Sequence, residues 1–212
     1  EGKKNGEIDF DGRDGYKRVK HEFKMLYFLI KKGIPVPDIK SSFTSSNNFY
    51  IVMEKIEGES IQSKLIHSTR KTGFIKFHNW ALQIVQLLTA IHKSGVAWRD
   101  CKPLNLIINK QHIIRPVDFE GACFLDKIDE IPWGSEGYLP PDYMNVNKKH
   151  FNPVKDDLYA LGATFFHIIT GSPLLKYEQK DRLLKVRRGY PKSILTLILR
   201  LLNIEADSRP TL

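Results

Sequence analysis

Cysteine is scarce in this chain, with only Cys101 and Cys123 among 212 residues. Two thiols are too few for the disulfide framework of a small secreted protein, so we expect a reducing cytoplasm and thiols that only pack. No uninterrupted apolar run reaches the length of a membrane-spanning helix, and no signal-peptide pattern opens the sequence, which predicts a soluble protein with no membrane partner. The phosphate-cradling pattern G-x-G-x-x-G is missing as well.

The charge balance is basic, with 33 Lys and Arg against 24 Asp and Glu, a formal net charge of +9 and a pI near 9.4. Such a balance suits nucleic acid or an anionic membrane surface when the cations cluster. Here the lysines are scattered among acidic residues. We therefore interpret them as a solvated surface and expect no nucleic-acid partner.

Apolar spacing predicts three long helices. The first lies within residues 14–32 and is stopped by Gly33 and Pro35. The second ends at Lys93, before a glycine cap. The third begins at Asn152-Pro153, a capping residue followed by a first-turn proline, and runs to Thr170.

Two stretches are expected to form strands. The run 49–54 alternates too little for a half-exposed strand, which favours a buried one that leads into a polar turn. Residues 106–109 and 113–117 are typical of a hairpin. The two ends of that hairpin would place Asn105 and Asp118 side by side.

Two short strings carry the chemistry: W-R-D-C-K-P-L-N at residues 98–105 and V-D-F-E at 117–120. Asp100 offers a carboxylate that accepts a hydroxyl proton. Asn105 and Asp118 offer hard oxygen ligands, and Mg²⁺ binds a few such ligands together with substrate phosphates. Lys102 is a compact cation that would neutralise charge on a transferring phosphoryl group.

These strings resemble the H-R-D-x-K-P-x-x-N and D-F-G motifs of protein kinases. The same order continues with G-S-E-G-Y-L-P-P-D-Y at 134–143, D-L-Y-A-L-G at 157–162 and S-R-P at 208–210, so the resemblance covers the chain from about Glu22 onward. It implies an α+β, protein kinase-like bilobal fold. We expect an incomplete N-lobe over residues 1–56 and a mainly helical C-lobe over 57–212, truncated at its end and cut from a longer polypeptide.

The resemblance also implies a nucleotide site for ATP or GTP with Mg²⁺. Met53 would guard the pocket behind the adenine ring, and the backbone of Glu54 and Ile56 would bond the edge of that ring. Ile107, on the first strand of the expected hairpin, is a further nucleotide-contacting residue by this resemblance. Asn105 and Asp118 would hold the metal.

Glu22 matches the helix glutamate that, in protein kinases, pairs with a strand lysine bound to the nucleotide phosphates. A solvated surface acid is the alternative interpretation of Glu22 from its helix alone. Lys3 and Lys4 are candidates for the lysine, although the stretch after them looks like an insertion and favours a lysine located before Glu1. Without a secure lysine and a phosphate-covering loop, these 212 residues alone are expected to have little activity.

Two positions depart from the kinase motifs, Trp98 in place of histidine and Glu120 in place of glycine. The string D-F-E-G-A at 118–122 and the opening of the chain resemble the kinase domain of class III lanthipeptide synthetases. That resemblance implies phosphorylation of Ser and Thr in a precursor peptide, followed by phosphate elimination. It also implies a lyase and a cyclase domain in the same parent chain.

Two other classes stay open, and a third, the aminoglycoside-type phosphotransferase, is disfavoured. A regulatory Ser/Thr kinase would carry a sensor or transmembrane region elsewhere in its full chain. A pseudokinase would bind without turnover, which the replacement at Trp98 favours and the intact Asp100 to Asp118 set opposes. An aminoglycoside-type phosphotransferase would lack the 134–143 and 208–210 segments.

The resemblance to protein kinases leads to three structural expectations. Asp157 lies on the apolar stripe of its helix, whereas Asp156 does not, and it would hold the backbone of residues 98–100; an ordinary first-turn acid is the alternative. Asp142 and Arg209 would form a buried ion pair. Trp98 would be buried against Phe119, with its indole N–H bonded to a backbone carbonyl or to Asp157.

Overall fold

The computed structural model describes residues 2–3, 6–8, 11–68, 71–128, 133–141, 152–186 and 189–212. The α-helices are α1 (Gly15–Lys31), α2 (Ile61–Ile66), α3 (Phe74–Lys93), α4 (Pro153–Thr170), α5 (Arg182–Lys185) and α6 (Lys192–Leu201). The strands are β1 (Gly2–Lys3), β2 (Ile39–Ser45), β3 (Asn48–Met53), β4 (Gly58–Ser60), β5 (Val96–Ala97), β6 (Leu106–Asn109), β7 (Ile114–Pro116) and β8 (Cys123–Phe124). Short 3-10 turns are η1 (Pro103–Asn105), η2 (Tyr177–Asp181) and η4 (Ala206–Ser208).

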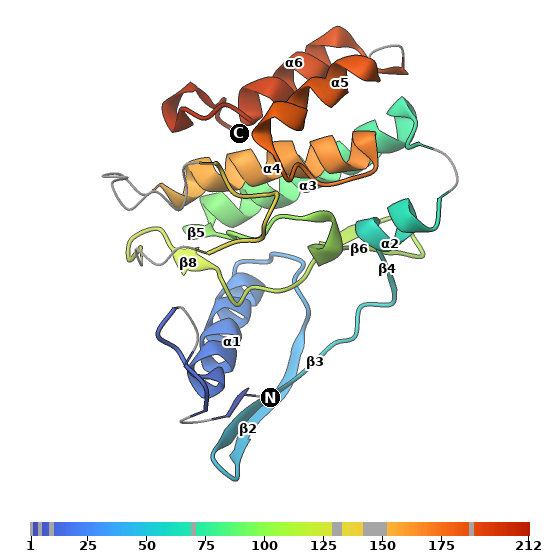
Figure 1. The fold of residues 1–212 in the computed structure, drawn as a ribbon. Helices are drawn as coiled ribbons and strands as arrows, with labels where there is room; N and C mark the ends of the chain where they lie inside the picture. Colours follow the sequence, from blue (N-terminus) through green and yellow to red (C-terminus); the bar gives the residue numbers. More distant parts are fainter. Residues whose placement is uncertain are drawn as a thin grey trace.

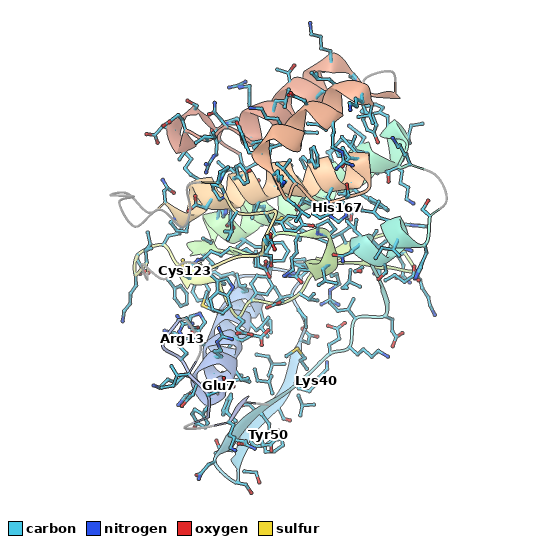
Figure 2. All side chains as sticks on the ribbon, viewed as in Figure 1. Glu7, Arg13, Lys40, Tyr50, Cys123 and His167 are labelled. Atoms are coloured by element: carbon cyan, nitrogen blue, oxygen red, sulfur yellow. The ribbon has the colours of Figure 1, made fainter. Side chains whose placement is uncertain are left out.

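The smaller end of the molecule is a sheet in the order β1-β3-β2 with α1 packed beside it (Figure 1). Helix α1 begins where Asp14 accepts a hydrogen bond from the Lys17 amide at 2.9 Å, which satisfies one of the free N–H groups of the first turn. Figure 2 shows Lys40 and Tyr50 on this sheet, far from His167 among the helices.

Between the sheet and the helical end lies a second small sheet, in the order β4-β6-β7. The β6–β7 hairpin pairs Leu106 with Pro116 and Ile108 with Ile114, close to the predicted bounds. Its inner side chains are buried against the helices, so its two ends are fixed relative to the larger body. Strands β5 and β8 form a separate pair that flanks the same region.

Helix α4 runs through the middle of the helical end, between α3 on one side and α5 and α6 on the other (Figure 1). Its start and end are as predicted: Asn152 caps the first turn, and Gly171 ends the helix with φ of 82°, a left-handed conformation that glycine adopts without cost. Nearly every residue of α4 is buried, including both Asp156 and Asp157. The expectation that Asp156 lies off the buried face is therefore wrong, because the buried guanidinium of Arg209 lies against that carboxylate.

The expected α+β bilobal architecture is confirmed, but one detail of the smaller end is wrong. The run predicted as a buried strand is β3, whose Val52 and Met53 are 45% and 36% exposed. Its sheet is covered by α1 on one face and leaves part of the other face open. The same sheet includes the short strand β1, which precedes the first helix and pairs Gly2 and Lys3 with Phe49 and Asn48.

Both cysteines are buried and neither is part of a disulfide, as expected for packing cysteines. Burial raises the pKa of the Cys101 thiol well above its usual value, which keeps it protonated and unreactive. The carbonyl of Cys101 accepts a hydrogen bond from Thr164 Oγ1 on α4, at 2.8 Å. The thiol region is thus part of the scaffold rather than of the chemistry.

Arg209 is 2% exposed, and its guanidinium forms hydrogen bonds inside the fold. Its Nη1 lies 3.4 Å from Asp156 Oδ1, and its Nε and Nη2 donate to the carbonyls of Asn203 and Ile204 at 2.9 and 3.0 Å. Asp142, the partner expected from the sequence, lies outside the described residues. That pairing stays a prediction, and the carboxylate of Asp156 is a partner that sequence reasoning missed.

In the described part of the chain, none of the helices has the length and apolar character needed to cross a membrane.

Candidate active site

The loop at residues 98–105, which carries the site, is held by hydrogen bonds to Asp157 of α4. Its two carboxylate oxygens accept the backbone N–H groups of Trp98 at 2.9 Å and Arg99 at 2.6 Å, and the ring nitrogen Nε2 of His92 lies 2.7 Å away. Asp157 is fully buried, and a buried carboxylate needs such donors. These contacts confirm the expected role of Asp157 and fix Arg99 at φ of 68°, which only an over-determined loop sustains.

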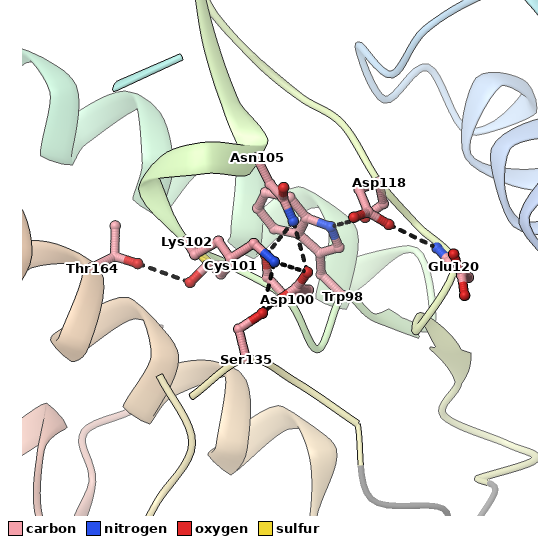
Figure 3. A network of polar contacts seen from close by, with 9 residues as sticks. All are labelled: Trp98, Asp100, Cys101, Lys102, Asn105, Asp118, Glu120, Ser135 and Thr164. Atoms are coloured by element: carbon pink, nitrogen blue, oxygen red, sulfur yellow. Dashed lines mark hydrogen bonds and ion pairs between the residues drawn. The ribbon is translucent and has the colours of Figure 1, made fainter. Parts of the chain in front are cut away.

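The carboxylate of Asp100 is the hub of the site (Figure 3). Its Oδ2 accepts from Lys102 Nζ at 2.7 Å and from Asn105 Nδ2 at 2.8 Å, while Oδ1 accepts from Ser135 Oγ at 2.8 Å. Lys102 also reaches Ser135 Oγ, at 2.7 Å. Asp100 is only 6% exposed, so these charge-assisted hydrogen bonds fix the orientation of its carboxylate and leave one acceptor position unused by these three side chains.

The hairpin brings Asp118 next to Asn105, as its two ends predicted. The backbone N–H of Val117 donates to the carbonyl of Asn105 at 3.0 Å, which joins the start of β6 to the end of β7. Asp118 follows directly, with φ of 66°, and its carboxyl group is accessible to solvent. Neighbouring protein atoms nevertheless remove part of its hydration and raise its pKa; Asp100 raises it further, and Lys102 opposes the shift.

These residues fit a magnesium ion shared with a nucleotide. The amide nitrogen of Asn105 donates to both the carbonyl and the carboxylate of Asp100, at 3.1 and 2.8 Å, so its amide oxygen is left to serve as a ligand. The carboxylate of Asp118 supplies the second oxygen. Among the described residues no group of three His, Cys, Asp or Glu side chains is placed to hold a metal alone. Two protein oxygens plus phosphates and water are what Mg²⁺ favours.

Trp98, which replaces the histidine of the kinase motif, is buried against Phe119 as expected. The side chain is 1% exposed and stacks on Phe119, with ring centroids 5.4 Å apart and planes at 18°. Its Nε1 donates to the carbonyl of Asp118 at 2.8 Å. The indole therefore supplies both the apolar contact and a polar link between the loop at 98–105 and the Asp118 turn, which confirms the expectation for Trp98.

Glu22 of α1 faces the Asp118 turn rather than bulk solvent. Burial raises its pKa to about 7; the charges of Asp118 and Glu120 add to the shift, and a hydrogen bond with the amide of Phe119 opposes it. Among the described residues it has no lysine or arginine at ion-pair distance. Lys3 is exposed on β1, and Lys4 lies outside the described residues, so the position of a lysine partner stays a prediction.

Replacing Glu22 by Gln is expected to flatten the pH dependence of stability. Because the folded-state pKa is raised, the contribution of Glu22 is fully present below its ordinary value of 4.5 and is lost as pH rises through about 7. Between pH 5 and 8 the wild type should therefore lose about 2 kcal/mol from this group. Urea unfolding at both pH values measures the difference, and the exposed Glu57→Gln should keep the wild-type profile. An unchanged profile for Glu22→Gln would contradict the assignment.

The expected nucleotide edge lies at the end of β3. The backbone N–H of Glu54 donates to the carbonyl of Asp38 at 2.8 Å, so only its carbonyl is left for an adenine ring. The side chain of Glu54 forms two bonds to the guanidinium of Arg115, at 2.5 and 2.9 Å, which lower its pKa. This pair ties the strand to the β6–β7 hairpin. The nucleotide contacts expected at Met53, Ile56 and Ile107 stay predictions.

Sequence reasoning missed three groups that complete the site. Ser135 donates a hydrogen bond to Asp100 and accepts one from Lys102; its place within G-S-E-G-Y at 134–138 was the available signal. Tyr138 is buried, and its hydroxyl lies 2.6 Å from His167 Nδ1; burial raises the pKa of the phenol and lowers that of the imidazole to about 4. That neutral pair anchors residues 133–141 to α4, and no local pattern announced it.

The chain matches the family described as Protein kinase domain over residues 7–212. A Wee1-like protein kinase of Arabidopsis thaliana is 34% identical over 107 residues, covering 50% of this chain and 20% of that protein. A cAMP-dependent protein kinase catalytic subunit-like protein of Caenorhabditis briggsae is 28% identical over 177 residues, 80% of this chain and 45% of that protein.

A probable serine/threonine-protein kinase of Clostridium acetobutylicum is 31% identical over 124 residues, 58% of this chain and 19% of that protein. In each case this chain aligns with less than half of the relative's length. The family match covers nearly every residue, including all of the site described above. This chain therefore belongs to the protein kinase domain family.

Proposed function

We propose that this domain transfers the γ-phosphoryl group of ATP to a serine or threonine hydroxyl of a protein or peptide, with Mg²⁺ as cofactor. The observation that carries the proposal is the convergence of Lys102, Asn105 and Ser135 on the carboxylate of Asp100. A carboxylate has about four acceptor sites. Three donors leave one for the hydroxyl of a substrate, in a fixed direction.

The position of each residue in the site indicates its role in the reaction. Asp100 orients the acceptor hydroxyl and takes its proton as the oxygen bonds to the γ-phosphorus and the bond to the leaving ADP oxygen breaks. Lys102 lies beside the path of the transferring group and neutralises part of its charge. Asn105 and Asp118 would hold Mg²⁺, which neutralises phosphate charge when bound. Little covalent work is required of the protein, so positioning carries most of the catalysis.

A finer proposal concerns the substrate. The D-F-E-G-A string at 118–122 and the opening of the chain support phosphorylation of a precursor peptide by a class III lanthipeptide synthetase, with lyase and cyclase domains as partners in the parent chain. The second candidate is a regulatory Ser/Thr kinase. It is favoured by the names of the relatives above, none of which is a lanthipeptide synthetase.

The test incubates the full natural chain that contains these residues with labelled ATP, Mg²⁺ and a Ser- and Thr-rich synthetic peptide. The matched control is the same peptide with every Ser and Thr replaced by Ala. Phosphate on the first peptide alone supports the proposal, and nucleotide binding without transfer to any hydroxyl would contradict it. GTP in place of ATP tests the nucleotide preference in the same assay.

Mass spectrometry of the same reaction over time separates the two substrate proposals. Phosphopeptide that then loses phosphate to give dehydrated residues supports the lanthipeptide pathway, because elimination needs a lyase in the same chain. Phosphopeptide that persists supports the regulatory kinase. The sequence flanking residues 1–212 in the parent chain gives an independent check, since it either encodes lyase and cyclase domains or does not.

A further inference from the structure

The turn at 118–122 bears against helix α1 through contacts that the kinase motifs do not include. Arg18 Nη1 lies 3.0 Å from Glu120 Oε1, and His21 Nε2 lies 2.7 Å from the carbonyl of Ala122. Glu120 stands where the family motif has glycine. A glycine there would leave this turn free to adopt other backbone angles, whereas Glu120 gives α1 a side chain to bind.

Arg18 is held in place before it meets Glu120. Its Nε donates to Asp11 Oδ2 at 3.2 Å, and the side chain of Asp11 is fully buried. The guanidinium lies over the ring of Trp133, 4.9 Å from the ring centroid. A planar guanidinium bonded at one edge and stacked on one face loses little further freedom when it binds a second carboxylate.

Trp133 also brings the two ends of the segment 120–133 into contact. A Cβ added at Gly121 would lie 1.7 Å from Trp133 Nε1, so the indole sits directly on the backbone of that glycine. Residues 120–133 contain no Ser, Thr or Tyr. Phosphorylation of Ser, Thr or Tyr therefore cannot order this stretch from within, whereas the contacts of Arg18 and Trp133 are available to do so.

The Arg18–Glu120 pair lies two residues along the chain from Asp118, the expected metal ligand. The backbone N–H of Glu120 lies 3.5 Å from Asp118 Oδ1, while Trp98 holds the carbonyl of Asp118 from the other side. Asp118 has φ of 66°, a left-handed conformation that needs support from its surroundings. Fixing the side chain of Glu120 thus keeps its backbone N–H beside the carboxylate of Asp118.

We propose that Arg18 and Glu120 are positioning residues that, with Trp133, hold the Asp118 carboxylate in its metal-binding orientation without phosphorylation of the segment. The proposal rests on the proposed function only for its turnover readout. Mg²⁺-dependent nucleotide binding tests it separately, because that binding needs Asp118 and not the transfer step. Failure of the two proposals is therefore distinguishable.

The experiment is a double-mutant cycle in the full natural chain with Arg18→Gln, Glu120→Gln and both together. The exposed Lys17→Gln, which removes the same charge from the neighbouring position of α1, is the matched control. The readout is the Mg²⁺ concentration that half-saturates binding of a fluorescent ATP analogue, followed by turnover at saturating Mg²⁺. Thermal unfolding of each variant is measured in parallel.

Each single variant should raise the half-saturating Mg²⁺ concentration about fivefold, since a partly buried ion pair with a preoriented guanidinium contributes about 1 kcal/mol. The double variant should match the worse single variant within about twofold, because both remove one interaction. Lys17→Gln should bind as the wild type does. If Arg18→Gln unfolds, Glu120→Gln carries the test, as that side chain is 32% exposed.

Additive effects in the double variant would overturn the proposal, and so would an unchanged Mg²⁺ requirement in Glu120→Gln. A drop in melting temperature with no change in Mg²⁺ requirement would mean that the pair is only structural. Loss of Mg²⁺-dependent binding after phosphatase treatment of the wild type would show that a phosphate is needed and would also overturn it. Absence of transfer to any hydroxyl, with the Mg²⁺ effects intact, would refute the proposed function alone.

Discussion

Asp100→Asn and Asp118→Asn should each strongly reduce phosphoryl transfer, but at different steps. Asp100→Asn removes the proton acceptor and leaves the metal ligands in place, so turnover should fall by about 10²–10⁴-fold while Mg²⁺-nucleotide binding stays nearly intact. Asp118→Asn replaces a charged metal ligand with a neutral one, so binding and turnover should both weaken. Nucleotide titration at several Mg²⁺ concentrations, with labelled phosphate transfer, separates the two results.

The exposed Asp126→Asn serves as the control for both variants, because it removes an acid from the same segment outside the site. It should bind and turn over as the wild type does. Near-normal phosphorylation by either Asp100→Asn or Asp118→Asn would show that the base or the ligand was assigned to the wrong residue. Equal loss of nucleotide binding in both would show that Asp100 is a ligand rather than the base.

Trp98→Ala is expected to produce the largest loss of stability. The indole is buried, stacks on Phe119 and donates to the Asp118 carbonyl, so alanine leaves both a cavity and an unpaired acceptor. Large-to-small changes of this kind cost about 3–5 kcal/mol. Denaturant unfolding of the full chain measures the effect.

Trp98→His is the matched comparison, because imidazole keeps a ring against Phe119 and can donate to the same carbonyl. It should retain most of the stability and activity. An alanine variant as stable as the wild type would contradict the packing described for this residue. A histidine variant as damaged as alanine would show that the size of the indole, rather than its N–H, is what the site requires.

The parts of the fold that the sequence predicted well are those whose signals are local. Asn152-Pro153 and Gly171 mark the ends of α4 because caps and breakers act within one turn. The buried Trp98 followed from its place in a motif and from the polar demands of an indole N–H. The burial of Asp157 was indicated by the spacing of its helix, whereas its backbone partners at Trp98 and Arg99 were implied by the resemblance to protein kinases.

The parts that were missed depend on partners far along the chain. The burial of Asp156 requires knowing that α6 and residue 209 return to cover α4. The Arg18–Glu120 pair joins residues that no local pattern connects, and the Glu54–Arg115 pair does the same. The partial exposure of β3 depends on which faces of its sheet are covered, which apolar content alone does not fix.

The most direct measurement is a crystal structure of the full chain with a non-hydrolysable ATP analogue and Mn²⁺, using the anomalous signal of the metal. We predict a peak within coordination distance, about 2.1 Å, of one Asp118 carboxylate oxygen and the Asn105 amide oxygen, with phosphate oxygens completing the shell. Asp100 should stay outside that shell, with an open acceptor site toward the γ-phosphate. A metal bound by Asp100, or a nucleotide bound without metal contact to Asp118, would contradict the account.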